Sequence, residues 1–220
     1  MGRPEDPRLL DVIEDQNRYA KAFVPSGGRL SGDGSSVYSL VPGAARRMFK
    51  DAPDAKLVFM LEAPVQRAMT AHAYNLTLDV ETEPHFEKAL LLESERKEQG
   101  GSPFLQYARG SRYREIIEPV DDLFGRDNVL ILIAEEAERA PHAAVAQLCA
   151  FLGIRPDAGS LPSLPRRRQS VVAEMLARVR SRRRQPEICA QFRSEMQSEV
   201  HWVEQRVGSA LDAWMFKDQE

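Results

Sequence analysis

Arg67 and Thr70 are the residues whose types and spacing first suggest ligand chemistry in this chain. They lie three positions apart, so on a helix they share one face, where a guanidinium and a hydroxyl can both donate to an anion. The predicted helix directly follows a strand, and its free N–H groups and its dipole favour negative charge at its N-terminus. The alternative is a structural role, with Arg67 in an ion pair, for example with Glu62.

Glu62 lies at the turn before this helix, where its negative charge would repel a bound anion. The run Leu57 to Leu61 is continuously apolar, as is typical of a parallel strand covered on both faces, and Pro64 suits a first helical position. Two like charges in close contact repel by roughly 4 kcal/mol at intermediate dielectric. Residues 56–75 therefore predict a strand–turn–helix anion site in which the turn carries a negative charge.

A strongly basic segment lies between Arg155 and Arg193, with ten arginines against three acidic residues and a local net charge of about +7. The triplets 166–168 and 182–184 flank an amphipathic stretch. Such a run of charged residues often forms only a solvent-exposed surface that binds no ligand. Its functional interpretations are a groove for a sulfated or phosphorylated polymer, a contribution to a cofactor loop, or a surface for an acidic partner. Because no aromatic residues are interleaved, nucleic acid is not the expected ligand.

Other patterns exclude common site types. The glycine-rich run at 27–36 lacks both the Gly-Lys-Ser/Thr ending of a phosphate loop and a preceding apolar strand, so it is interpreted as a loop. The four histidines have no metal-ligand spacing, and no metal is expected. Cys149 and Cys189 match no metal or redox motif, and Cys149 lies in an apolar helical run as a reduced core residue.

The elements that position these residues alternate between helix and strand. Two apolar strands are predicted, at Leu57–Leu61 and at Asn128–Glu136. Helices are expected at Leu9–Ala22, in 43–56, from Pro64 to about Leu76, in His85–Gln99, from Tyr113 until Gly125, from Pro141 until Gly153, and in Glu195–Trp214. This alternation predicts an α/β domain with a parallel sheet.

The length of 220 residues suits a single domain with a sizeable core. We expect an N-terminal helix in 1–24, an α/β core in 25–155 and a basic, helical C-terminal part in 156–220. A net charge of −3 gives no general attraction to nucleic acid. The sequence shows no signal-peptide core and no run long enough to cross a bilayer, so a cytoplasmic protein without membrane contact is predicted.

Three motifs, in order and spacing, resemble those of the sulfotransferases. The stretch 61–72 reads Leu-Glu-Ala-Pro-Val-Gln-Arg-Ala-Met-Thr-Ala-His, similar to the family's Leu-Arg-x-Pro-x-x-Arg-Ala-x-Ser-x-Tyr. Residues 32–38, Gly-Asp-Gly-Ser-Ser-Val-Tyr, resemble the Gly-Glu-x-Ser-Pro-x-Tyr of bacterial and heparan-type members. Residues 110–154 resemble the family's tyrosine helix, strand, acidic pair and Phe-Leu-Gly helix. The resemblance covers roughly residues 20–155.

The resemblance implies a fold, a cofactor and roles for individual residues. The expected fold is an α/β, P-loop-like parallel sheet flanked by helices, shortened at its N-terminus and with a helical C-terminal part. The donor would be 3′-phosphoadenosine 5′-phosphosulfate, whose sulfuryl group passes to a hydroxyl or amine of a small-molecule or carbohydrate acceptor. Asp33 would be the general base. The remaining roles are cofactor binding by Arg67 and Thr70 and substrate binding by Tyr38, His72 and Tyr113.

Two departures from the family pattern leave alternatives open. The family's strand-end arginine, which holds the 3′-phosphate, corresponds to Glu62, and the Lys-x-Gly-Thr-Thr type loop that cradles the 5′ side has no counterpart before Gly32. The chain could therefore be a non-catalytic binding or assembly protein, a pseudoenzyme, or a fold used for different chemistry. A sheet without its first strand exposes apolar surface, so self-association or a covering protein partner is expected. Tyr113 itself is expected to pack into the core at the start of its helix, although the family's matching tyrosine faces the site.

Overall fold

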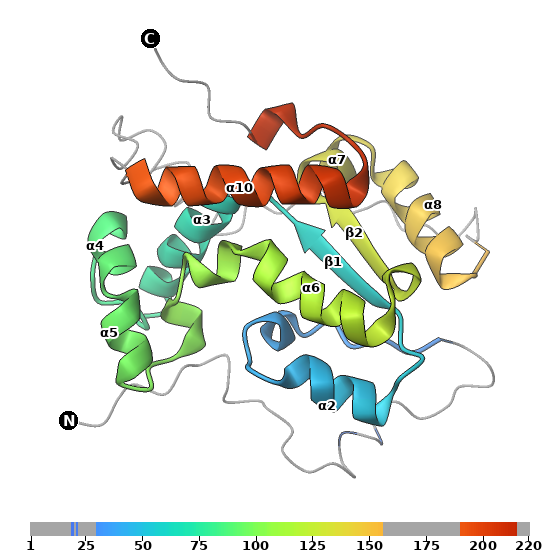
Figure 1. The fold of residues 1–220 in the computed structure, drawn as a ribbon, viewed down its shortest axis with the longest axis horizontal. Helices are drawn as coiled ribbons and strands as arrows, with labels where there is room; N and C mark the ends of the chain where they lie inside the picture. The colour runs from blue at the N-terminus through green and yellow to red at the C-terminus, as the bar shows by residue number, and fades with distance from the viewer. Residues whose placement is uncertain (1–18, 20, 22–29, 156–189, 215–220) are drawn as a thin grey trace.

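The computed structural model describes residues 19, 21, 30–155 and 190–214, whose elements surround a two-stranded parallel sheet (Figure 1). β1 (Leu57–Leu61) pairs in parallel with β2 (Val129–Ile133), with Leu57 opposite Val129 and Leu61 opposite Ile133. Both strands were predicted from their apolar runs. The second is shorter than expected, because residues from Ala134 onward form helix α7 (Ala134–Arg139) in a stretch of good helix formers.

Helices account for most of the remaining described chain. The longer ones are α2 (Ala44–Asp51), α3 (Pro64–Thr77), α6 (Tyr113–Phe124), α8 (Pro141–Leu152) and α10 (Ala190–Val207). Their ends follow the sequence signals: proline opens α3 and α8, while Gly125 (φ 80°) and Gly153 (φ 70°) end α6 and α8 with positive φ. The helical stretch expected at His85–Gln99 is two short helices, α4 (Phe86–Leu91) and α5 (Glu93–Glu98).

Short 3₁₀ turns join these elements. They are η2 (Ser36–Ser39), η3 (Pro103–Leu105), η4 (Arg109–Ser111), η5 (Arg126–Asn128) and η6 (Asp212–Trp214). Two of them, η3 and η4, fill the connection from α5 to α6, and this connection contributes several of the polar contacts described below. This connection runs beside α3, where Ser111 of η4 contacts the first turn of the helix.

The main hydrophobic core lies between the sheet, α6 and α10. Figure 1 shows α10, in red, crossing one side of the sheet and α6, in yellow-green, crossing in front of it. The buried members are Leu61, Tyr113, Ile117, Val120, Phe124, Val129, Ile131, Ile133, Val200, Val203, Leu211 and Trp214. The helix expected from Tyr113 until Gly125 is confirmed as α6, which supplies core residues at helical spacing. The helix expected at Glu195–Trp214 is shorter at its C-terminal end: α10 ends at Val207, and Leu211 and Trp214 reach the core from the segment after it.

A second core lies at the other side of α3. It joins α3 to α4, to the loop after α5 and to the start of α10 through Val65, Ala68, Phe86, Ala89, Tyr107, Phe192 and Met196. Beside it lies a buried ion pair between Glu81 and Arg96, with nitrogen–oxygen distances of 2.8 Å. This second core packs against the first half of α3 through Val65 and Ala68, whereas Asn75 near the C-terminal end is held by the Phe104 carbonyl and the Tyr107 hydroxyl.

The expectation that both faces of β1 are covered is wrong. Leu57, Phe59 and Leu61 pack against the main core, but Val58 and Met60 are 42% and 58% exposed. Because side chains alternate along a strand, one face of β1 is covered and the other is open to solvent. None of the helices in the described part of the chain is long and apolar enough to cross a membrane. The expected helix at Leu9–Ala22 and the arginine triplets fall largely or wholly outside the described residues.

Candidate functional site

The candidate site is the junction where β1 turns into α3. The parallel register places Leu61 beside Ile133, so the residues that follow the two strands meet at the same edge of the sheet. Glu62 follows β1, and Glu135 lies in the first turn of α7 after β2. The Ala63 N–H, directly before α3, donates a hydrogen bond to Oε1 of Glu135 at 3.1 Å. A carboxylate of the chain itself thus lies where a helix N-terminus favours an anion.

The second oxygen of this carboxylate is unmatched. Oε2 of Glu135 is buried and has no hydrogen-bond partner among the described residues. A buried acceptor without a donor is costly, which is why such atoms are rare in folded proteins. The junction therefore has acceptor capacity left over, and it would favour an added donor such as a hydroxyl or an ammonium group more than an added phosphate.

Tyr113 connects α6 to the same junction. Its ring is 4% exposed in the main core, and its hydroxyl donates to the backbone carbonyl of Glu62 at 2.7 Å. Burial raises the pKa of Tyr113, so the hydroxyl stays protonated and keeps its role as a donor. The structure places this tyrosine below the junction, where it holds the turn that presents Glu62.

Arg67 is held by the loop after α5. Its Nε donates to the Ser111 hydroxyl at 2.7 Å, and one Nη donates to the Tyr107 carbonyl. Ser111 in turn donates to the carbonyl of Pro64 at 2.7 Å, which closes a link between the first turn of α3 and η4. A Cβ atom at Gly110 would lie 2.7 Å from this guanidinium, so glycine is needed for the close approach. The observed contacts give Arg67 a positioning role.

Thr70 lies one turn further along α3 and is half-buried. Its hydroxyl accepts a hydrogen bond from Nε2 of Gln66 at 3.1 Å. A hydroxyl in this arrangement still has its own proton to donate. Arg67 and Thr70 thus share a helix face as predicted, but the arginine is committed to backbone and serine contacts while the threonine can still donate.

His72 is buried at the α3 side of the second core. One ring nitrogen, Nε2, lies 2.8 Å from the carbonyl of Glu83, and the ring makes edge-to-face contacts with Phe86 and Tyr107 at centroid distances of 5.6 and 5.4 Å. Burial lowers the pKa of His72, although the Glu83 carbonyl opposes the effect. The observed environment is that of a satisfied, neutral histidine.

Asp33 lies in a hydrogen-bonded turn of the N-terminal segment. Its Oδ2 accepts from the hydroxyls of Tyr38 at 2.6 Å and Tyr19 at 2.9 Å, and its Oδ1 accepts from the Ser35 N–H at 2.8 Å. Burial raises the pKa of Asp33, but the hydrogen bonds from Tyr38 and Ser35 outweigh it and hold the pKa at about 2. Burial and the bond to Asp33 raise the pKa of Tyr38 in turn. The structure thus brings Asp33 and Tyr38 together.

Glu135 and Ser111 are the site residues that the sequence interpretation did not identify. A signal for Glu135 was present, because each apolar strand is followed within two residues by a glutamate and parallel strands end at one edge of a sheet. Ser111 carries no such signal, since its partners Pro64 and Arg67 are more than forty residues away in the sequence.

The residues at the junction do not fit the 3′-phosphate of a donor nucleotide in the usual way. Glu62 and Glu135 are both acidic, and the Ala63 N–H that could hold a phosphate oxygen already donates to Glu135. Thr70, which is half-buried on α3, keeps a hydroxyl proton that it can donate.

Comparison with solved structures gives a clear match. The crystal structure of a sulfotransferase from Alicyclobacillus acidocaldarius superposes on this chain with a TM-score of 0.73 and 28% sequence identity. The match covers 97% of this chain and 80% of that one. Neither the comparison with models of protein families nor the comparison with curated proteins gives a match.

Proposed function

We propose that this chain, which has the fold of the sulfotransferases, transfers a sulfuryl group to a hydroxyl or amine of an acceptor. The observation that carries the proposal is the match over 97% of the chain to a bacterial sulfotransferase. Relatives with this fold use 3′-phosphoadenosine 5′-phosphosulfate, and we propose a donor of that class. Given the two glutamates at the junction, most of its binding would come from contacts other than a 3′-phosphate at the start of α3.

Asp33 is the proposed base for the acceptor proton. A general base works best with a pKa near the working pH, and a carboxylate held at about 2 is a weak proton acceptor. An acceptor hydroxyl that took the place of the Tyr38 or Tyr19 hydroxyl would donate its hydrogen bond to the carboxylate of Asp33, the group that would then take its proton. The carboxylate–tyrosine pair would then orient the acceptor before the proton moves.

Titration calorimetry with 3′-phosphoadenosine 5′-phosphate, the stable product of the donor, tests this proposal. We expect submillimolar binding that weakens in Thr70→Val, which keeps the side-chain shape but removes the free hydroxyl. Thr77→Val is the matched control, because it makes the same change at the far end of α3, where the hydroxyl bonds to the Tyr74 carbonyl. No detectable binding at millimolar nucleotide would contradict the proposed donor.

A second candidate function is favoured by the contact between Glu135 and Ala63. A carboxylate that already lies at the helix N-terminus is what a non-catalytic binding protein with a lost donor site would show. Transfer of labelled sulfate from 3′-phosphoadenosine 5′-phosphosulfate to a panel of hydroxyl and amine acceptors distinguishes the two. Label transfer that is lost in Asp33→Asn supports the enzyme, and its absence with every acceptor supports the binding protein.

Self-association is proposed from the open face of β1. Val58 and Met60 project from the same side of the strand and are both more than two-fifths exposed, an apolar surface that a second copy would cover. Light scattering across protein concentrations should show a dimer, and Met60→Lys should shift it to monomer. We also propose a cytoplasmic location, in which the free thiol of Cys149 stays reduced.

A further inference from the structure

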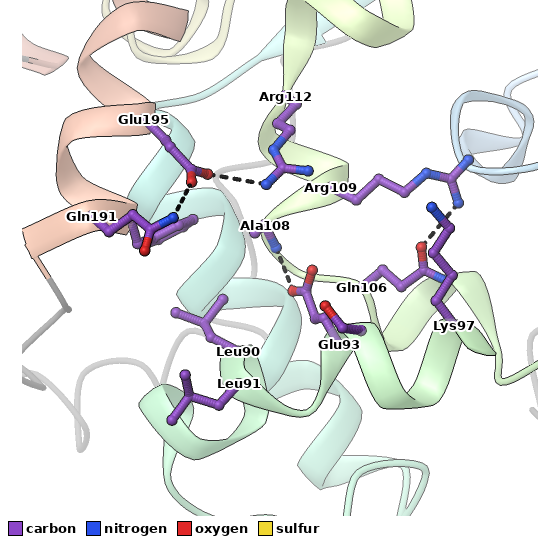
Figure 2. A pocket seen from close by; sticks show the side chains of 12 residues that line it. Leu90, Leu91, Glu93, Lys97, Gln106, Ala108, Arg109, Arg112, Gln191 and Glu195 are labelled. Atoms are coloured by element: carbon purple, nitrogen blue, oxygen red, sulfur yellow. Dashed lines mark hydrogen bonds and ion pairs between the residues drawn. The ribbon is translucent and has the colours of Figure 1, made fainter. Parts of the chain in front are cut away.

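A cleft of about 240 Å³ lies apart from the β1–α3 junction, between α5, the loop at 106–112 and the start of α10. Figure 2 shows its walls: the α4–α5 residues on one side, Glu195 and Gln191 of α10 on another, and Arg109 and Arg112 across the top. None of these side chains takes part in the contacts of the β1–α3 junction. Their charges and partners indicate what the cleft can hold.

The two acidic residues of the cleft already accept hydrogen bonds from other residues of the chain. Glu93 accepts the backbone N–H of Ala108 at 2.5 Å, so its carboxylate ties the loop to α5. Glu195 accepts from Arg112 at 3.0 Å and from Gln191 at 3.2 Å. Neither carboxylate contacts the other two basic side chains of the cleft, and both are matched by their own donors.

Lys97 and Arg109 are the basic residues that remain. Arg109 is half-buried, and one of its Nη atoms donates to the neutral amide oxygen of Gln106 at 3.1 Å. Lys97 has no ion pair or hydrogen bond through its ammonium group within the described ranges 30–155 and 190–214. Figure 2 shows the charged ends of both side chains directed to the same end of the cleft, beside Gln106. Two cations that converge without a carboxylate favour an anion between them.

The opposite part of the cleft is apolar. Leu90, Leu91 and Phe192 line it, and Leu91 is 77% exposed, an unusual state for a leucine beside a cavity. Clefts that bury drug-sized ligands have volumes of roughly 300–1,000 Å³, so this one suits a group about the size of a single ring. Leucine side chains at one end and two cations at the other match a small molecule with an apolar body and one anionic group.

We propose that this cleft binds a small amphipathic organic anion, with its carboxylate or sulfate on Lys97 and Arg109 and its ring against Leu90 and Leu91. This inference goes beyond the proposed function, because it needs neither the donor nucleotide nor the β1–α3 junction. Arg112, the third basic residue of the cleft, is already paired with Glu195 at 3.0 Å, so Lys97 and Arg109 are the cations left for the anionic group. Both sources of the anion, a carboxylate and a sulfate ester, satisfy the same pair of cations.

The test is an NMR titration of the full chain, labelled with ¹⁵N, with four probes: phenyl sulfate, phenylacetate, inorganic sulfate and the neutral benzyl alcohol. We expect the aromatic anions to bind with a Kd on the order of a millimolar and to shift the amide signals of residues 106–112. Whichever of the two aromatic anions binds more tightly identifies the source. Binding should weaken with added salt, since exposed charges are screened.

Variants assign the binding to named side chains. Lys97→Gln together with Arg109→Gln should weaken phenyl sulfate binding by about tenfold, whereas Lys88→Gln, an exposed lysine of α4 outside the cleft, should leave it within about twofold. Leu91→Ser should weaken the aromatic anions but not inorganic sulfate, and its exposure makes it a safe change for folding. Equal binding of benzyl alcohol, an unchanged Kd in the double variant, or no shift with any anion at ten millimolar would each overturn the proposal.

Discussion

The two ends of α3 each bring a carboxylate against backbone N–H groups, but the two carboxylates are matched differently. At the C-terminal end, Glu81 accepts from the Thr82 and Glu83 N–H groups, from both Nη atoms of Arg96 and from the Tyr107 hydroxyl. At the N-terminal end, Glu135 accepts from the Ala63 N–H through one oxygen, while its other oxygen is buried without a partner among the described residues.

This difference separates a structural carboxylate from a functional candidate. Burial raises the pKa of Glu81, but the hydrogen bonds from Arg96, the Glu83 N–H and Tyr107 together with the charge of Arg96 outweigh it, so the net shift is downward and the group stays ionised. A fully matched, buried carboxylate gains nothing from a ligand. One with an unmatched oxygen at a helix N-terminus interacts with whatever enters the site. The completeness of the hydrogen bonds, more than the presence of charge, therefore indicates which end of α3 can bind.

The largest effect is expected on the stability of the fold, at the C-terminal end of α3. Arg96→Met should lower the free energy of unfolding by about 3–5 kcal/mol, because it leaves the Glu81 carboxylate, with a side chain 0% exposed, without its charge partner. Urea unfolding at neutral pH measures this change.

Arg114→Met is the matched control for that experiment. Arg114 pairs with Glu118 at 2.9 Å, nearly the same distance as the Arg96 pair, but the two side chains are 61% and 45% exposed. Exposed pairs contribute about 0–1 kcal/mol, so a change of that size is expected. Equal losses in the two variants would mean that burial does not make the Arg96–Glu81 pair more important for stability than an exposed pair.

The second-largest effect is expected on nucleotide binding at the N-terminal end of α3. Glu62→Arg and Glu135→Gln should each raise the affinity for 3′-phosphoadenosine 5′-phosphate by at least about tenfold, because each removes a negative charge from the position of an anion. Titration calorimetry measures the change. Glu136→Gln is the control, since this exposed neighbour on α7 carries the same charge. Affinities that do not change in either variant would show that the junction plays no part in nucleotide binding.

The smallest effect is a pH dependence of stability from His72. Its pKa in the folded chain lies below the unfolded value of about 6.5, so the unfolded state binds the proton more readily. The stabilising contribution is complete above that value and is lost as the pH falls below it. We expect the Tm difference between pH 8 and pH 5 to shrink in His72→Phe, which keeps the ring contacts but cannot titrate.

His85→Gln serves as the control for this pH experiment. His85 lies directly before α4, two residues after the Glu83 whose carbonyl contacts His72, and its side chain is 67% exposed. Its replacement should therefore leave the Tm difference between the two pH values as it is in the unchanged chain. If His72→Phe also leaves the difference unchanged, the buried environment of His72 does not couple folding to pH.

Local sequence signals determined the helices and strands of this chain. The apolar runs, Pro64, Pro141, Gly125 and Gly153 located β1, α3, α6, α8 and the start of β2 nearly to the residue, because each signal acts through its neighbours. The family motifs also predicted the fold that the structural match supports. Where the prediction extended β2 through Glu136, helix propensity and packing after Ile133 decided otherwise.

Only the tertiary structure decided what the site residues contact. The spacing of Arg67 and Thr70 predicted one helix face, but the loop that places Ser111 and Tyr107 against Arg67 comes from forty or more residues away. The contact of Glu135 with Ala63 likewise spans 72 residues and depends on the strand register. Residue types and local spacing are written in the sequence. The pairing of distant side chains, which determines whether a charged group is matched or available, arises only when the sheet and helices pack together.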